Sequence, residues 1–345
     1  MFIKKNYGFK RLIQFTWFHI LWLSVWGCAP VLLHNYFHQL YFPMPWLPVA
    51  VIGTAVAFYV GFKNNASYDR MWEARKIWGG IVNSSRIWGS ISKSYVSNTF
   101  KKENATQEEL HGIHLRLIYR HIAWIYTLRE QLLKPTPWEH ISHENKHMRN
   151  YAKLRRKGAI DLFQTESLQD LIGNLIPLSD AKNACAAPNS ATRLIDMQSS
   201  DLQKLRDQGL IDDFRHMEMQ NILNEFYVHQ GKVERIKNYP LPRQYASTSF
   251  YFTGIFIFLL PFGMLPLFET LGHEFVWLSV PFTVLVGWVF LMMELVGDYS
   301  ENPFEGLPND IPMKSLCRTI EIDLRAMLGE TELPPKVEAI DGILM

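Results

Sequence analysis

Apolar residues gather in four long runs that form two pairs along this chain. One pair lies within Leu12–Phe62 and the other within Gln244–Met313, and neither window contains a lysine or an arginine. Because a helix rises about 1.5 Å per residue, about 20 apolar residues cross a bilayer core of about 30 Å. The pattern therefore predicts two hairpins of membrane-spanning helices. The four expected spans are Phe15–Phe37, Trp46–Phe62, Phe250–Phe268 and Phe275–Leu295.

Basic residues flank both windows. They are Lys4, Lys5, Lys10 and Arg11 before the first, Lys63, Arg70, Arg75 and Lys76 after it, Lys232, Arg235, Lys237 and Arg243 before the second, and Lys314 and Arg318 after it. Loops near spanning helices keep their lysines and arginines on the cytoplasmic side. We therefore expect a multi-pass protein of the cell (inner) membrane, with both termini and the region between the hairpins in the cytoplasm.

An apolar helical hairpin buried inside a large soluble protein is the alternative interpretation. The mean hydropathy of −0.06 is compatible with it. That average, however, combines two strongly apolar blocks with a polar middle, which favours membrane hairpins. The three cysteines lie far apart in the sequence and suggest neither a disulfide framework nor a zinc site.

The region between the hairpins shows helical periodicity and little two-residue alternation, so we expect an all-α protein. Leu110–Leu133 and Asp201–Ile236 are the clearest helical stretches. After the fourth run, an apolar stripe at helical spacing predicts a C-terminal helix, formed by Met313, Leu316, Cys317, Ile320, Leu324 and Met327. The expected organisation is a first hairpin at 1–62, a cytoplasmic helical region at 63–243, a second hairpin at 244–298, and the C-terminal helix with a flexible tail from Glu330 at 299–345.

The second apolar run contains the most suggestive pattern. Thr54, Phe58 and Phe62 follow each other at four-residue steps, so they share one helix face. A stripe of small residues, Gly53, Ala57 and Gly61, lies beside that face and would allow close helix packing. Repeated around an axis, the phenylalanines would form an apolar constriction that dewets. Ordinary packing of two core phenylalanines is the alternative.

Two motifs make the chain resemble the bestrophin family, including its bacterial members. The first follows the second run and reads Gly61-Phe62-Lys63-Asn64-Asn65-Ala66-Ser67-Tyr68-Asp69-Arg70-Met71-Trp72-Glu73-Ala74-Arg75. The second follows the fourth run and reads Glu301-Asn302-Pro303-Phe304, then Asn309-Asp310-Ile311-Pro312. The order of hairpin, helical region, hairpin and C-terminal helix is also similar to that family.

The resemblance implies a homopentameric ion channel with one axial pore. It implies that the second span lines an apolar neck at Thr54, Phe58 and Phe62, where Thr54 replaces the bulky apolar residue of the family. It also implies a second constriction on a helix before the third span, at Met217 or, one turn earlier, at Phe214. Animal members bind calcium after the fourth span, at positions that include Asn302 and Asp310. Here Glu305-Gly306-Leu307-Pro308-Asn309 replaces their acidic run, and Leu307 and Pro308 offer no side-chain oxygen, so we expect a structural turn without calcium activation.

Two charged clusters allow more than one interpretation. Asp69, Arg70, Glu73 and Arg75 could line an ion-attracting vestibule, or could pair within the helix or between subunits. His143-Glu144-Asn145-Lys146-His147 matches the H-E-x-x-H pattern of zinc proteases, with His140 as a third imidazole. Its highly charged surroundings favour a chance match without a bound metal, although an exposed histidine cluster could also capture a metal ion.

The function that we expect is passive conduction of small monovalent ions, with no catalysis and no cofactor. The sequence contains no glycine-rich phosphate loop that could power a pump. A net charge of +2 does not decide the sign of the ion, because the charge that matters is local to the pore. Chloride is favoured by the family resemblance alone. The expected partners are further copies of the chain, membrane lipid and monovalent ions, and no nucleic acid. The alternatives are a cation channel on the same fold, a membrane-anchored zinc hydrolase that uses His143, Glu144 and His147, and a non-conducting membrane scaffold.

Overall fold

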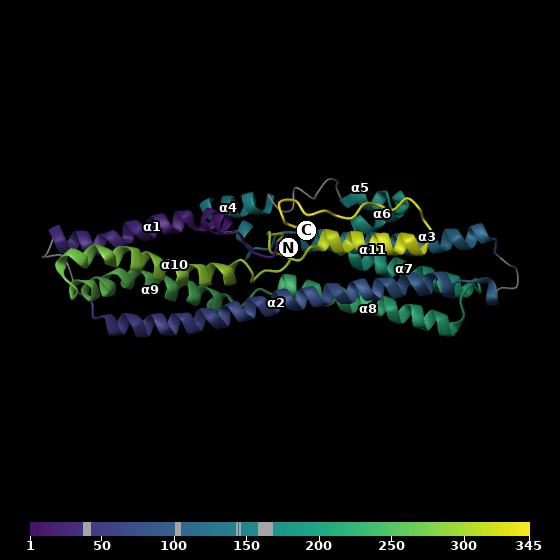
Figure 1. The fold of residues 1–345 in the computed structure, drawn as a ribbon. Helices are drawn as coiled ribbons and strands as arrows, with labels where there is room; N and C mark the ends of the chain where they lie inside the picture. Colours follow the sequence, from purple (N-terminus) through teal and green to yellow (C-terminus); the bar gives the residue numbers. More distant parts are fainter. Residues whose placement is uncertain (37–42, 101–104, 143, 145, 158–167) are drawn as a thin grey trace. The chain divides into compact units, whose positions relative to one another are not determined.

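The computed structural model describes the chain except residues 37–42, 101–104, 143, 145 and 158–167. The described part is helical, and its β structure is limited to two isolated bridges, Phe2 to Ile343 and Ile340 to Ile343. The all-α prediction is therefore confirmed for these residues (Figure 1). The helices are α1 (Phe9–Tyr36), α2 (Trp46–Tyr95), α3 (Gln107–Leu132), α4 (Lys146–Arg156), α5 (Leu168–Gly173), α6 (Leu178–Ala186), α7 (Ser190–Asp207), α8 (Asp213–Asn238), α9 (Arg243–Glu269), α10 (Ser279–Asp298) and α11 (Met313–Met327).

Four helical segments of the described chain are long and apolar enough to cross a membrane. They are α1, α2, α9 and the continuous stretch His273–Asp298, which consists of the 3-10 helix η5 (His273–Leu278) and α10. Each matches one of the four apolar runs, and Phe37, the last residue of the first run, lies outside the described residues. α2 is much longer than the run at its start, because the helix continues through the polar motif to Tyr95.

The chain divides into two compact units, each assembled from segments that are distant in the sequence. The apolar unit comprises Lys4–Arg70 and Pro240–Asn302. The polar unit comprises Met1–Ile3, Met71–Tyr239 and Pro303–Met345. α2 therefore contributes its first half to the apolar unit and its second half to the polar unit.

Within the apolar unit, α1 and α9 both pack against α10 (Figure 1). α2 joins them through Val49, Val56 and Val60, which are buried in one core with Phe256 of α9. Gly53 makes this approach possible, because a Cβ atom at residue 53 would lie only 2.6 Å from the Phe256 ring. The small-residue stripe does not pack as a whole. A Cβ atom added at Gly61 would have no neighbouring atom within 4 Å.

Within the polar unit, α3 lies at the centre of the core. Its residues Leu117, Ile118 and Ile125 are fully buried, and a capping box of Thr106 and Glu109 begins the helix. The second half of α2, together with α7, α8 and α11, contributes to the same core. Cys317, Ile320 and Leu324 of the stripe in α11 are fully buried, as amphipathic packing requires.

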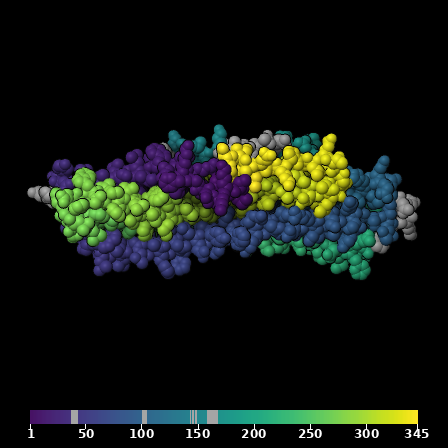
Figure 2. Space-filling model, viewed as in Figure 1, coloured from purple at the N-terminus to yellow at the C-terminus, as the bar shows by residue number. Residues whose placement is uncertain are grey.

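The expectation of a flexible C-terminal tail was wrong. The Ser315 N–H donates to the Met345 carbonyl at 2.7 Å, and the Arg318 guanidinium donates to the Pro335 carbonyl at 3.3 Å. Met345 is buried. These hydrogen bonds to backbone carbonyls hold a segment without helical periodicity, which the sequence pattern does not reveal. The C-terminal part of the chain, yellow in Figure 2, forms much of the visible face of the polar unit.

Candidate functional site

The predicted neck residues lie on an exposed face of α2 within the apolar unit. Phe58 and Phe62 are 70% and 52% exposed, and Thr54 is exposed as well. The two rings meet edge to face with their centroids 4.6 Å apart. The Thr54 hydroxyl donates to the Ala50 carbonyl at 3.0 Å, so its hydrogen-bonding capacity is partly used within its own helix. In the single chain neither phenylalanine is a core residue, and a lipid, a pore or another subunit must cover this face.

A buried ion pair lies directly after the neck residues, and sequence reasoning missed it. The Lys63 ammonium lies 2.5 Å from the Glu294 carboxylate of α10, and the two side chains are 1% and 3% exposed. The Ser249 hydroxyl of α9 donates to the other Glu294 oxygen at 2.5 Å. Glu294 could have been noticed as an ionisable residue inside an apolar run, which normally has a partner. The identity of that partner depends on tertiary packing.

Further contacts tie α2 to the end of α10 just beyond the ion pair. The Asn64 side-chain amide donates to the Met293 carbonyl at 2.9 Å. Gly297 lies against Asn64 so closely that a Cβ there would be 2.0 Å from the Asn64 side-chain oxygen. The Arg70 guanidinium donates to the Glu301 carbonyl at 3.0 Å.

Members of the charge cluster after the neck have partners on other elements. Arg70 contacts the Glu301 backbone within the apolar unit. Within the polar unit, Glu73 pairs with Arg235 of α8 at 3.0 Å, and these side chains are 46% and 66% exposed. Asp69 is exposed and Arg75 is half-buried. A surface pair such as Glu73–Arg235 is worth under about 1 kcal/mol in a single chain.

The residues of the predicted second constriction lie near the start of α8. Met217 is 64% exposed and Phe214 is 83% exposed. Next to them on the same helix, Met219 and Leu223 are buried in the core of the polar unit. The helix therefore presents an apolar exposed face that the single chain does not cover.

The turn after α10 is held by a buried carboxylate. Asp310 accepts hydrogen bonds from the backbone N–H groups of Phe304, Gly306 and Ile311, at 3.0, 2.7 and 2.7 Å. Burial raises the pKa of Asp310, while these N–H donors lower it. Phe304 and Gly306 have positive φ angles of 71° and 82°, so the turn is tight. Asn302, the other matched position, is 7% exposed and its amide lies 3.4 Å from the Glu301 carboxylate.

The histidine motif falls partly outside the described residues, because His143 itself and the side chain of His147 are not described. His140 is described, and its ring lies 2.9 Å from the Glu305 carboxylate, which also accepts from the His140 backbone N–H at 2.7 Å. Glu144 is exposed. Within the described ranges, no group of three or more His, Cys, Asp or Glu side chains is placed to hold a metal ion.

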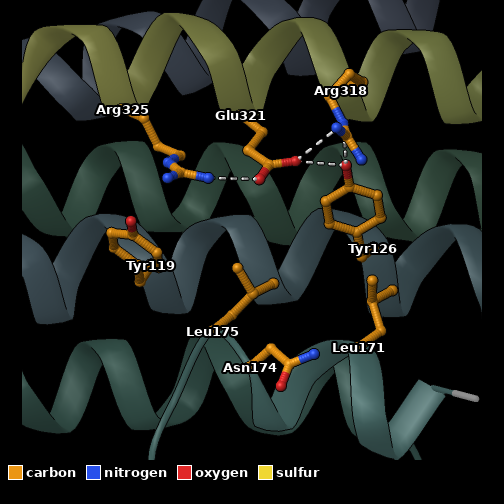
Figure 3. Close-up of a pocket in the computed structure, with 8 residues that line it drawn as sticks. All are labelled: Tyr119, Tyr126, Leu171, Asn174, Leu175, Arg318, Glu321 and Arg325. Atoms are coloured by element: carbon orange, nitrogen blue, oxygen red, sulfur yellow. Dashed lines mark hydrogen bonds and ion pairs between the residues drawn. The ribbon is translucent and has the colours of Figure 1, made fainter. Parts of the chain in front are cut away.

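A pocket of about 280 Å³ lies between α3, α5 and α11 in the polar unit (Figure 3). Its lining residues are Tyr119, Tyr126, Leu171, Asn174, Leu175, Arg318, Glu321 and Arg325. Glu321 accepts from the Tyr126 hydroxyl at 2.7 Å and pairs with both arginines, at 3.2 and 3.3 Å. Burial raises the pKa of Tyr126, and burial together with the Glu330 hydrogen bond raises that of Tyr119 to about 12. The charged groups of this pocket are thus paired with one another.

The comparisons with known proteins agree on one family. Residues 10–326 match the model of the bacterial and fungal bestrophin protein family. A protein of Escherichia coli, named voltage-dependent anion channel-forming protein YneE, is 27% identical over 290 residues, which are 84% of this chain and 79% of that protein. A Ralstonia nicotianae protein, named voltage-dependent anion channel-forming protein RSc3414, is 26% identical over 309 residues, which are 87% of this chain and 85% of that protein.

A solved structure has the same fold. The crystal structure of a bacterial bestrophin homolog from Klebsiella pneumoniae superposes with a TM-score of 0.73 and 21% sequence identity, and the match covers 91% of this chain and 99% of that one. The resemblance seen in the two sequence motifs is therefore confirmed. The match to the family model covers most of the length of the chain, including the four apolar helical segments. This chain is a membrane protein and belongs to the bacterial and fungal bestrophin family.

Proposed function

We propose that this chain is one subunit of a passive anion channel, a homopentamer in the cell (inner) membrane that conducts small monovalent anions such as chloride. Relatives that share most of its length are named voltage-dependent anion channel-forming proteins, which supports the sign of the ion. Both termini and the polar unit are proposed to lie in the cytoplasm, because lysines and arginines are absent from the apolar windows and frequent at their flanks.

The observation that carries this proposal is the exposed aromatic face of α2. A helix of the apolar unit that shows two large rings, 70% and 52% exposed, needs a surface to meet. In a ring of identical subunits around one axis, Phe58 and Phe62 would face the centre and form two stacked apolar rings. Such a constriction excludes water when it is narrow, and passes ions when it widens.

The orientation of the aromatic rings in the neck would bear on the sign of the ion, and the rings alone allow either sign. The edge of a phenyl ring carries partial positive charge and its face partial negative charge. Phe58 and Phe62 meet with their planes at 85°, so the pair can present an edge of one ring and a face of the other to an ion path. Edges presented to the axis would favour anions, whereas faces presented to the axis would favour cations.

The second constriction is proposed at Met217, with Phe214 one turn earlier, on the exposed apolar face of α8.

The turn at Asn302–Asp310 is proposed to be structural, and the channel to open without calcium. The support is that Asp310 already accepts three backbone hydrogen bonds. A carboxylate has about four acceptor sites, so one that accepts three hydrogen bonds has little capacity left to bind a cation.

Reconstitution tests this proposal. Purified protein in liposomes should release chloride down its gradient when a counter-ion pathway is supplied, without nucleotide and without added metal. The variant Phe58→Ala with Phe62→Ala should change the rate of that release, while an equal amount of protein is incorporated. Assembled protein that releases neither anions nor cations would favour the non-conducting scaffold instead.

A further inference from the structure

The strongest unexplained feature of the apolar unit is the ion pair beside the proposed neck. Lys63 follows Phe62 directly, and successive side chains on a helix are about 100° apart. Phe62 is 52% exposed, whereas the Lys63 side chain is 1% exposed, so α2 turns from its open face to its packed face between these two residues.

A charge buried to this degree is retained only where its partners compensate the lost hydration. The Lys63 ammonium contacts Glu294 at 2.5 Å and lies 3.9 Å from Asp298. Glu294 accepts from Lys63 with one oxygen and from Ser249 with the other. One carboxylate therefore joins α2, α9 and α10 at a single level.

The same level of the unit also fixes α2 by shape. Asn64 donates to the Met293 carbonyl and fills the space left by the missing side chain of Gly297. A rotation of α2 that moved Phe62 away from its present direction would separate Lys63 from Glu294 and break the hydrogen bond from Asn64 to the Met293 carbonyl. The direction of the neck rings is thus mechanically coupled to the ion pair.

We propose that Lys63 and Glu294 are positioning residues that set the rotation of α2, and through it the direction of Phe58 and Phe62 in the open neck. This inference rests on the proposed channel function. The two charges do not touch the permeating ion. They hold α2 by one face while a different face of the same helix lines the pore, so their loss changes how often the neck is open rather than which ion passes.

Single-channel recording of Lys63→Met and Glu294→Gln in planar bilayers tests this role. Each variant should change the open probability by about tenfold, the shift that a coupling free energy of ordinary size produces. The reversal potential should stay that of the wild type. The conservative variant Lys63→Arg keeps a positive charge beside Glu294 and Asp298, and should stay near the wild-type open probability. Arg86→Gln is the control, because Arg86 also forms an ion pair from α2, with Asp323 at 2.8 Å, but is 47% exposed.

Wild-type open probability and conductance in both single variants would overturn the inference. If the single variants fail to assemble, the double variant Lys63→Met with Glu294→Met decides, because it leaves no unpaired buried charge. It should assemble and still open abnormally. Normal opening in that double variant, or its failure to assemble, would overturn the positioning role. A wild-type protein that assembles but carries no current would instead contradict the proposed function itself.

Discussion

The rings of Phe58 and Phe62 meet edge to face on α2, with centroids 4.6 Å apart and planes at 85°. Each ring therefore supports the other, and together they form one apolar surface rather than two separate side chains. Neither ring is buried in the chain that carries it. A substitution of one phenylalanine leaves the other in place, so the pair must be removed together to reveal its function.

Replacement of both phenylalanines by alanine should widen the neck and raise the single-channel conductance or the open probability. The two side chains are largely exposed, so the fold of the chain should change little. Single-channel currents in planar bilayers are the measurement. Thr54→Val is the comparison variant on the same helix face. It should lower the conductance or the open probability, because it makes the neck more apolar at position 54. Currents of wild-type size in the double variant would show that Phe58 and Phe62 do not line the narrow part of the pore.

Asp310→Ala should lower the free energy of unfolding by about 2–4 kcal/mol, because it leaves three buried N–H groups without an acceptor. The melting temperature in detergent measures this, with Asp323→Asn as a control whose ion pair is partly exposed and worth under about 1 kcal/mol.

Wild-type currents should persist in a calcium chelator. A channel that needs micromolar calcium to open would show that the turn has a second role.

Glu73→Gln should lower the yield of pentamer in detergent and leave the reversal potential of assembled channels unchanged. Within one chain the Glu73–Arg235 pair is exposed, so its loss should hardly change the stability of the subunit. If a subunit interface buries the Glu73–Arg235 pair, the loss of one partner costs much more free energy, because the other charge stays buried without compensation. Size-exclusion chromatography and bilayer recording separate the two effects. Intact pentamers with altered ion selectivity would place Glu73 in the pore instead.

Acid should destabilise the polar unit through His121. Its ring is buried beside Phe226 and lies 2.9 Å from the Ser85 hydroxyl, and burial lowers its pKa to about 3. The unfolded chain takes up this proton below its ordinary pKa of about 6.5, whereas the folded chain does not, so stability is lost as the pH falls. Between pH 7 and pH 5 the loss should be about 2 kcal/mol. His121→Gln, which keeps a hydrogen-bonding group, should have a melting temperature that falls less over this range than that of the wild type.

The sequence predicts the apolar helices well, because each is a long continuous apolar run. It also predicts the C-terminal helix well, because its apolar residues recur at helical spacing on the side that is buried. It fails where structure depends on partners far along the chain. Phe62 looks like the end of a span, yet α2 continues to Tyr95, because its polar second half packs in another core. Lys63 and Glu294 are 231 residues apart, and no local pattern could pair them.

A local sequence signal marks the break between α7 and α8. Asp201–Ile236 reads as one helical stretch, but α7 ends at Asp207 and α8 begins at Asp213. Gly209 adopts a φ of 71°, and the Asp212 side chain accepts the Arg215 N–H at 3.0 Å to begin the second helix. A glycine three residues before an aspartate is a typical stop and start signal. The break could therefore have been predicted from the sequence.

The reversal potential of the wild-type channel under a KCl gradient tests the central claim most directly. The protein, recovered as an assembled oligomer and inserted in a planar bilayer, should show unitary currents that reverse near the chloride equilibrium potential, without nucleotide or calcium. Currents that reverse near the potassium equilibrium potential would contradict the anion assignment. An assembled protein with no unitary currents at any voltage would contradict the channel itself.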